Sequence, residues 1–458
     1  MTDHIHTIES YFRPRIKQPA IEFKALLRSI NPLLLLMLVT DLLTPILIWK
    51  GILPASLRWL SHAAAFALII SLFTRMLITN KIHLSVLLIM GLSIISTIIA
   101  IYNGQGIVAT GWGWWIMFQF PLLGIYASYF ARWPDHFLKY LWYFCVSVLV
   151  LQVFVQMGQY LSGERMGDNL AGTFGQHGTG ILIIFMIFVY CLALGRWLTN
   201  KQWFPVILVI FLGGICSLLA ELKFFLLAIP LLSGIAVFIY TARIRKLSRL
   251  ILFGIGLIII CTLFILAYNA LIPGATPLHN FIQNPETLLQ YVYRSYRRVS
   301  GTTVYYDIGR NFALEYGWNQ IKQDPITFLF GFGLGAGSES KSLGTVGIAI
   351  ERGLLGMTLS TNLLVFMQEF GVFGLILLAC FIMWLVLQLT RFIHDQTNPH
   401  IKGFAYGLML FTMLWPLWLW YTMAWTFRVP MLIYWISLGY VLKAARKSKV
   451  SVSVQNEQ

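Results

Sequence analysis

Charged residues are scarce in this chain. Asp, Glu, Lys and Arg make up 11% of the 458 residues, whereas 58% are hydrophobic; a soluble domain has about 25% charged residues. A soluble fold of this length could not bury so much apolar surface, but a lipid bilayer can accommodate it. A bilayer core of about 30 Å requires about 20 apolar residues as a helix, because lipid cannot satisfy open backbone groups. The composition therefore predicts an all-α polytopic integral membrane protein.

Signatures of metal, nucleotide and disulfide chemistry are also missing. There is no C-x-x-C, no H-E-x-x-H, no Walker motif and no cluster with metal-ligand spacing. The glycine run at 331–337 has the wrong spacing for a dinucleotide fingerprint, and we expect it to allow close backbone packing. The sequence therefore gives no reason to expect a cofactor. All five cysteines fall inside predicted spans and are expected to be packing residues: Cys145, Cys191, Cys216, Cys261 and Cys380.

Apolar runs recur along the chain and predict about twelve transmembrane helices. The predicted spans are Pro32–Trp49, Trp59–Leu77, Ile82–Tyr102, Trp112–Ala131, Phe137–Leu161, Thr179–Trp197, Phe204–Leu219, Phe224–Tyr240, Leu250–Tyr268, Thr361–Leu389, Phe404–Trp420 and Arg428–Leu442. We therefore expect a cytoplasmic segment at 1–30, nine spans within 31–268, a large external segment at 269–360, three spans within 361–442 and a cytoplasmic tail at 443–458.

The net charge of +16 admits two interpretations, nucleic-acid binding or membrane topology. Lys and Arg residues gather in alternate connections, as expected when basic residues set the orientation of a membrane protein. We therefore expect both termini in the cytoplasm and no nucleic-acid partner. With this orientation, the basic residues in the short outer loops are Lys50, Arg58, Arg165, Lys223 and Arg428.

The outer connection from Asn269 to Ser360 is about 90 residues long. A connection of this length usually carries its own structure or a function. Asn284-Pro285 is typical of a helix start, and three arginines that follow would share one helix face. These residues are Arg294, Arg297 and Arg298. The sequence therefore predicts a large helical outer loop.

A second helical stretch is predicted in the same connection, from about Tyr305 to Lys322. Its apolar positions predict that Phe312, Tyr316 and Leu314 are buried. The stretch should end before Asp324-Pro325, because the residue before proline disfavours the helical conformation.

Two outer turns carry polar groups at a membrane boundary, where such groups are costly and often functional. The loop before the sixth span contains Arg165 and His177 among glycines; it is either a flexible entry loop or part of a site. Glu221 and Lys223 lie between the seventh and eighth spans, where they either turn the chain or contribute chemistry.

The arginines of the large loop, including Arg310, concentrate positive charge outside, against the topological trend. A solvated basic face explains any one of them, but an anionic ligand better explains the cluster. The planar guanidinium donates two hydrogen bonds to a phosphate and keeps its charge. In the tenth span, Glu369 needs a partner if it is buried, so either a structural hydrogen bond or a catalytic role is expected.

Tryptophans gather near the predicted outer ends of several spans. An interfacial belt is the usual explanation, because the indole has an apolar body and a polar N–H group. A platform on which sugars stack is the alternative. The residues are Trp112, Trp114, Trp115, Trp415, Trp418, Trp420 and Trp425.

Four short motifs follow one another along the chain. They are Arg165 with Gly172-Thr173-Phe174 and His177; Lys223 after an apolar run; Arg310-Asn311-Phe312-Ala313 with Asp324-Pro325 and Gly331-x-Gly333-x-Gly335; and Asn362 with Glu369-x-Gly371-x-x-Gly374. Together with the topology, their order resembles the Wzy and O-antigen ligase superfamily of bacterial glycan polymerases and ligases. Lys223 stands where that family usually has Arg. Thr361 stands where its ligases usually have His, which favours a polymerase.

The resemblance implies a GT-C-like fold in a bacterial inner membrane, with the large loop in the periplasm. The substrate would be an oligosaccharide repeat on a polyprenyl diphosphate, polymerised into surface polysaccharide (O-antigen or exopolysaccharide) by metal-independent glycosyl transfer. A sugar hydroxyl of one unit attacks the anomeric carbon of another, and fixed cations stabilise the diphosphate that leaves. Membrane lipid and a chain-length regulator or export machinery are the further partners that it implies.

Site residues follow from the same resemblance. The diphosphate-binding candidates are Arg310, Lys223, Arg165, Arg294, Arg297 and Arg298. The candidates for the catalytic base are Glu221, His177 and Glu369, which the sequence does not rank. Further substrate contacts are expected from Asn362 and Asp307.

Three alternatives remain open. An O-antigen ligase would transfer the glycan to a lipid acceptor. A lipid-linked oligosaccharide flippase or other transporter would place charged groups near the midplane of the membrane, and often shows paired halves, which this sequence lacks. A structural partner in a synthase complex would carry no chemistry of its own.

Overall fold

The computed structural model describes residues 31–134, 136–164, 166–167, 169–175, 178–244, 262, 295–300, 303–308, 310–340, 342–351 and 361–456. In these residues, seven helices are long and apolar enough to cross a membrane, and a bent pair of helices would make an eighth span. They confirm the prediction of a helical membrane protein. The total of twelve spans and the GT-C-like arrangement stay predictions.

The seven helices fall where apolar runs predict them. They are α3 (Pro32–Trp49), α4 (Arg58–Thr79, after the short 3-10 helix η1, Ala55–Leu57), α5 (Leu84–Tyr102), α7 (Phe137–Leu161), α8 (Thr179–Asn200), α10 (Lys223–Ile244) and α17 (Asn362–Asp395). The bent pair is α18 (Pro399–Met413) and α19 (Trp415–Tyr421), which meet at 48°. The remaining long helices are α6 (Ile107–Tyr129), α9 (Phe204–Leu219) and α20 (Arg428–Asn456). The predicted span Leu250–Tyr268 lies outside the described residues, apart from residue 262.

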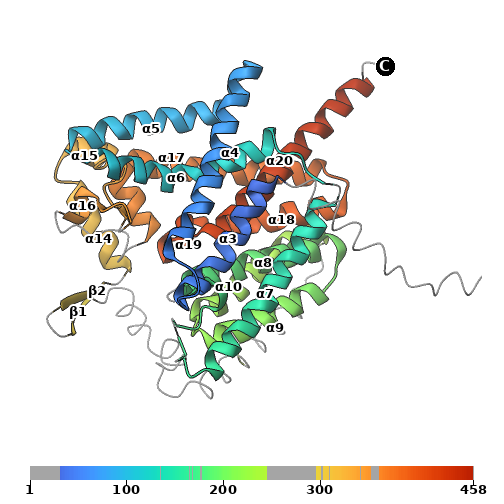
Figure 1. Cartoon of the computed structure of the whole chain (residues 1–458). Coiled ribbons are helices and arrows are strands. Elements are labelled where there is room, and N and C mark those ends of the chain that lie inside the picture. Colours follow the sequence, from blue (N-terminus) through green and yellow to red (C-terminus); the bar gives the residue numbers. More distant parts are fainter. Residues whose placement is uncertain are drawn as a thin grey trace, which may run out of the picture.

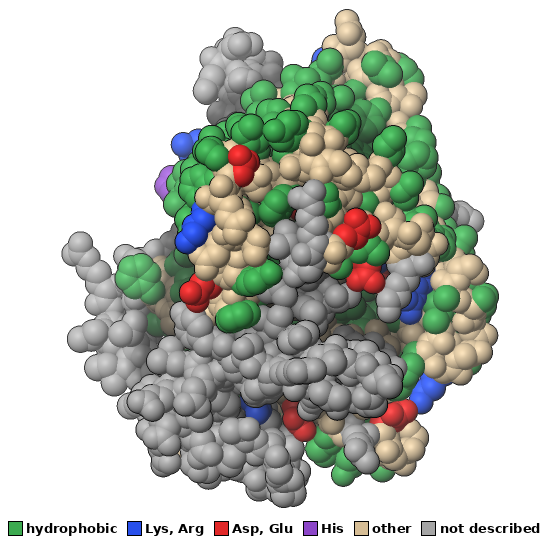
Figure 2. Space-filling view, turned by 90° about the vertical axis from the view of Figure 1, so that its left-hand side faces the viewer, with side chains coloured by type: hydrophobic (Ala, Val, Ile, Leu, Met, Phe, Trp, Pro, Cys, Tyr) green, Lys and Arg blue, Asp and Glu red, His purple; other side chains and the backbone are tan. Residues whose placement is uncertain are grey.

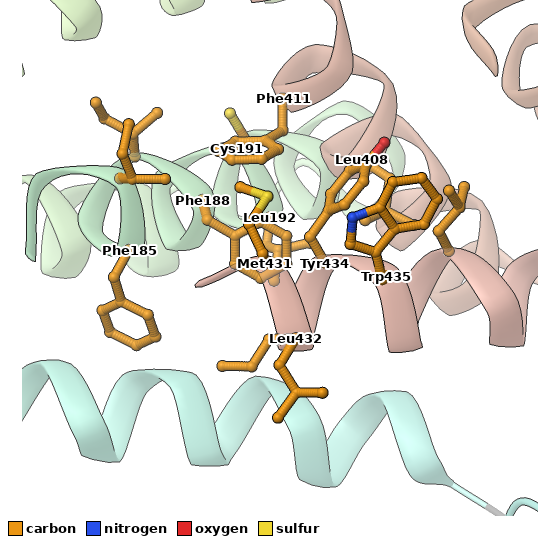
Figure 3. Close-up of a cluster of buried hydrophobic side chains, with 14 of the residues drawn as sticks. Phe185, Phe188, Cys191, Leu192, Leu408, Phe411, Met431, Leu432, Tyr434 and Trp435 are labelled. Carbon is orange, nitrogen blue, oxygen red and sulfur yellow. The ribbon is translucent and has the colours of Figure 1, made fainter. Parts of the chain in front are cut away.

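Helix α8 forms the centre of the bundle (Figure 1). It packs against α7, α9, α10, α18 and α20, and its side chains are buried on nearly all sides. Phe188 of α8 meets Phe411 of α18 and Tyr434 of α20 in one aromatic cluster (Figure 3). Because the helix is apolar all round, it requires neighbours on every side.

Glycine allows α8 and α18 to approach closely. A Cβ atom added at Gly195 would lie 2.1 Å from the carbonyl oxygen of Gly403 and 2.6 Å from the nitrogen of Gly407. Small residues bring membrane helices together in this way, because association in lipid depends on van der Waals contact. On the face seen in Figure 2, hydrophobic side chains cover much of the described upper part, with Asp, Glu, Lys and Arg side chains scattered among them.

Basic side chains from two helices cap the end of α6. Arg75 of α4 donates to the carbonyl oxygen of Phe130 at 3.3 Å, and Lys443 of α20 donates to that of Ala131 at 2.6 Å. Arg446 donates to the carbonyl and hydroxyl oxygen atoms of Ser128. The last carbonyl groups of a helix lack intrahelical partners and carry partial negative charge, so cations stabilise them.

The segment 269–360, which the sequence predicts to lie outside and which we call the outer segment, differs from the prediction in its first part. Residues Ser295–Ser300 form strand β1, which pairs antiparallel with β2 (Thr303–Ile308). The helix face predicted for Arg294, Arg297 and Arg298 is therefore wrong for 297 and 298, because a strand has a period of two and helical spacing does not apply. Valine and tyrosine in both strands, and threonine in β2, favour the extended conformation. Arg294 and the predicted helix start at Asn284 lie outside the described residues.

The second predicted helix is confirmed in its later part only. Helix α14 runs from Arg310 to Ile321, whereas Tyr305 belongs to β2. Its buried residues are Ala313, Gly317 and Ile321, and the three predicted ones are only partly buried. The buried face packs against Leu364 and Met367 of α17, since the absence of a side chain at Gly317 allows close contact. The helix ends before Asp324-Pro325, as predicted.

Asp324 begins the next helix, α15 (Pro325–Phe330). Its carboxylate accepts hydrogen bonds from the backbone N–H and the hydroxyl of Thr327, at 2.8 and 2.9 Å. These bonds favour the charged form and lower the pKa of Asp324 below its ordinary value. The strands β3 (Glu339–Ser340) and β4 (Thr345–Val346) and the short helix α16 (Ile348–Glu351) complete the described outer segment.

The glycine run fills a break in α17. Gly371 has φ +62° and interrupts the helix, so the carbonyl groups of Gln368 and Glu369 lose their helical partners. The backbone N–H groups of Phe332 and Gly333 donate to these two carbonyls at 2.6 and 3.2 Å. A Cβ at Gly333, where φ is +92°, would lie 2.2 Å from the backbone nitrogen of Ala100 in α5. The close backbone packing expected of this run is observed.

Most of the predicted outer tryptophans do not form a surface belt. Trp415, Trp418 and Trp425 are between 1% and 6% exposed and pack in the aromatic core. The indole N–H groups of Trp112, Trp114 and Trp115 donate to Glu339, Ser93 and His62 rather than facing water alone. Of the cysteines, Cys145, Cys191 and Cys216 are buried as expected, Cys380 is exposed, and Cys261 lies outside the described residues.

Candidate functional site

Arg310 joins the outer segment to the membrane helices. It is the first residue of α14, and its Nε atom donates to the carbonyl oxygen of Tyr421 at the end of α19, at 2.6 Å. The guanidinium lies 4.3 Å from the centre of the Tyr421 ring. The next residue, Asn311, accepts a hydrogen bond from Trp420 at 2.8 Å. Arg310 makes no ion pair with any side chain that the structure describes.

Tyr421 connects Arg310 to the turn that carries Lys223. The Tyr421 ring stacks on Phe224, with ring centres 3.9 Å apart and an angle of 21° between the planes. Phe224 follows Lys223 in α10. Arg310 and Lys223, two of the predicted diphosphate-binding residues, are therefore brought near each other, where α10 begins and α19 ends. They are 87 positions apart in the sequence.

The turn itself is tightly built. Glu221 adopts the left-handed conformation, with φ +52°, which is uncommon outside glycine. Ser217 and Leu222 bond to each other twice, since the Leu222 N–H donates to the Ser217 carbonyl at 2.9 Å and the Ser217 hydroxyl donates to the Leu222 carbonyl at 2.7 Å. The Glu221 and Lys223 side chains are half-buried. The turn therefore fixes the backbone positions of Glu221 and Lys223 between the end of α9 and the start of α10.

The glycine-containing loop before α8 approaches this turn. The N–H of Gly167 donates to the carbonyl of Leu219 at 3.2 Å, and Gly167 lies beside the Glu221 carboxyl group. Glu164 of the same loop pairs with Lys50, at the end of α3, at 3.2 Å. The two candidates of this loop, Arg165 and His177, lie outside the described residues.

Three glutamines on α7 fix the buried part of this loop, a feature that sequence reasoning missed. Gln152 exchanges hydrogen bonds with Thr173 at 2.5 and 2.8 Å, and Gln159 does so with Gly172 at 3.1 and 3.2 Å. Gln156 donates to the carbonyl of Leu170. Their spacing of four and three residues places them on one helix face, which was the available signal in an apolar run. A buried loop requires such partners for its backbone.

Glu369 is held by the glycine run, whereas Asn362 bonds the residues that follow Tyr421. Glu369 is fully buried, and its Oε1 atom accepts from the Gly337 N–H at 3.3 Å and the Ser338 hydroxyl at 3.1 Å. Asn362 receives the Trp425 N–H on its side-chain oxygen at 2.7 Å and donates its own backbone N–H to the carbonyl of Thr422 at 3.3 Å. Both residues hold segments of the outer surface onto α17. Asp307, Arg297 and Arg298 are placed on β1 and β2 by their backbone only.

A second missed feature is a polar network inside the bundle, centred on Arg428 of α20. Its Nε atom donates to Asp41 of α3 at 2.7 Å, and its other nitrogen atoms donate to Ser61 and Gln119 at 2.5 and 3.2 Å. His62 lies 3.1 Å from the guanidinium and accepts the Trp115 N–H at 2.8 Å. Asp41 is the one acidic residue in the run 32–49, which was the signal in the sequence.

No metal-binding group is found among the residues that the structure describes, where no three His, Cys, Asp or Glu side chains gather. Comparisons of the chain with protein-family models, with curated proteins and with solved structures gave no match. The function is therefore argued from the geometry and from the sequence motifs.

Proposed function

We propose that this protein polymerises oligosaccharide repeat units carried on polyprenyl diphosphate, at the outer face of a bacterial inner membrane. The observation that supports this most directly is the position of Arg310. Arg310 has no acidic partner among the described side chains, and through Tyr421 and Phe224 it lies near the turn with Lys223. A diphosphate attached to a lipid is an anion at the membrane surface, which is where the charge distribution of the sequence predicts this turn.

The proposed reaction joins two repeats without a metal. A sugar hydroxyl of one repeat attacks the anomeric carbon of another, a new C–O bond forms, and the bond to the lipid diphosphate breaks. Arg310 and Lys223 bind the diphosphate and stabilise the charge that develops on it. Glu221 takes the hydroxyl proton in this proposal, because it is half-buried beside Lys223, whereas Glu369 is fully buried under the glycine run.

Reconstitution tests the proposal. Purified protein in vesicles is supplied with a purified lipid-linked repeat, and the products are separated by size. We expect products that grow by whole repeats. Arg310→Ala should lower the rate about 100-fold, the usual loss when one fixed charge-stabilising donor is removed. Lys322→Ala provides the matched control, because it removes an exposed basic residue just after the same helix.

The outcomes separate the alternatives. Transfer of unextended glycan to a lipid acceptor would indicate a ligase, and movement of the substrate across the membrane without extension would indicate a transporter. Polymerisation at the wild-type rate by Arg310→Ala would contradict the role of Arg310.

A further inference from the structure

Arg196, near the end of α8, differs from other arginines that lie over aromatic rings. Its guanidinium is 4.9 Å from the centre of the Trp142 ring. It donates to no protein oxygen among the described residues, and its Nε atom is buried without a partner. The stacked arginines that do donate to protein oxygen atoms are Arg75, Arg310, Arg428 and Arg446.

The surrounding helices offer no counter-charge to Arg196. The helices packed against α8 are α7, α9, α10, α18 and α20, and neither they nor α8 contain Asp or Glu. A charge taken out of water is costly unless it is paired, and arginine in particular keeps its charge. Among the described residues, this half-buried cation therefore has no acidic partner.

The position of Arg196 suits a lipid headgroup. It lies four residues before the end of α8, where Lys201 is the cap residue, and Gly403 of α18 packs against it, which places Lys402 at the same end. Trp197 packs on Trp203 and Tyr240, with ring centres 4.8 and 5.3 Å apart. Aromatic rings together with basic residues are typical of the membrane–water interface, and the charge distribution predicts that this end faces the cytoplasm.

We propose that Arg196 binds the phosphate of an anionic phospholipid in the leaflet at this end of the bundle. Stacking on Trp142 holds the guanidinium in one plane, so that it can donate to two phosphate oxygen atoms. Basic pockets between membrane helices on the cytoplasmic side bind anionic headgroups in this way. The proposal is independent of the reaction at the opposite end.

Lipid retention tests the proposal on the full-length protein. Protein in nanodiscs of phosphatidylglycerol and phosphatidylcholine is released, and native mass spectrometry counts the phosphatidylglycerol that remains bound. Arg196→Met should lower retention about fivefold, the effect of one basic residue at an anionic surface. Arg196→Lys keeps the charge but loses the planar pair of donors, so its lipid retention should lie between that of the wild type and that of Arg196→Met. Arg391→Met removes an exposed basic residue at the predicted inner end of α17 and should retain lipid like the wild type.

Equal retention by the wild type and Arg196→Met would overturn the proposal. If Arg196→Met does not fold, Arg196→Gln gives the same comparison with a neutral polar side chain. A further arm adds inorganic phosphate to nanodiscs of phosphatidylcholine alone. Stabilisation by inorganic phosphate that is lost in the Arg196 variant would show a site for free phosphate and overturn the assignment to lipid.

Discussion

Arg310 and Arg428 occupy opposite situations in the same molecule. Arg428 is 21% exposed, and its guanidinium nitrogen atoms are bonded to oxygen atoms of α3, α4 and α6, with the Asp41 carboxylate balancing its charge. Arg310 gives one hydrogen bond to a carbonyl and has no carboxylate partner among the described residues. Arg428 stabilises the helix bundle. Arg310 has further guanidinium N–H groups that no described residue accepts, and these can bind a ligand. The hydrogen-bond and ion-pair partners of a basic residue therefore distinguish a structural role from a ligand-binding role.

The largest expected effect is on stability, at Asp41. Asp41→Ala should lower the free energy of unfolding by about 3–5 kcal/mol, because it leaves the Arg428 charge buried without compensation. Thermal unfolding in detergent measures the change. Asp395→Ala is the control, since this aspartate is 59% exposed and its partner in the described structure is the exposed His394. A stable Asp41→Ala protein would show that Arg428 does not depend on its carboxylate partner.

Arg310→Lys should affect activity rather than stability. Lysine keeps the positive charge but loses the planar pair of donors, so we expect the polymerisation rate to fall about tenfold, or about 1.4 kcal/mol in the barrier. The melting temperature should stay near that of the wild type. The comparison between the two arginines would fail if Arg310→Lys unfolded more easily while its rate per folded molecule was unchanged.

The smallest effect is expected at His62. Its ring nitrogen accepts from Trp115 and lies beside Arg428. His62→Gln should cost about 1 kcal/mol of stability, the usual net value of one hydrogen bond, because the glutamine oxygen can replace one acceptor. Unfolding in detergent would detect it. Lost polymerisation with unchanged stability would instead place the Arg428 network in the reaction.

Comparison of the elements shows where sequence patterns suffice. Local signals predicted the helices correctly in most cases: apolar runs set α3 to α10, and Asp324-Pro325 ended α14. The strand β1 was missed because arginines at spacings of three and one also fit a helix face, and pairing with β2 decided the conformation. The tryptophans near residue 418 were expected at the surface, but the bend between α18 and α19 turns them into the core.

The candidate site could be predicted only as a set of residue types. Arginine in the outer segment and lysine after α9 indicated an anionic ligand, but not that Tyr421 and Phe224 bring them to one place. For Glu369 the sequence left a structural hydrogen bond and a catalytic role equally open. The structure places it under the glycine run with Ser338 as its partner. The glutamines of α7 were overlooked because each one alone is unremarkable in an apolar helix.

By itself the sequence indicated a membrane protein, the position of most apolar helices and which connections carry positive charge, since these depend on local composition. Tertiary structure decided which cations are already paired. Asp41 meets Arg428 across 387 positions, and Tyr421 meets Arg310 across 111. Such partners come from different helices, so only the packing of the bundle reveals which charges remain for a ligand.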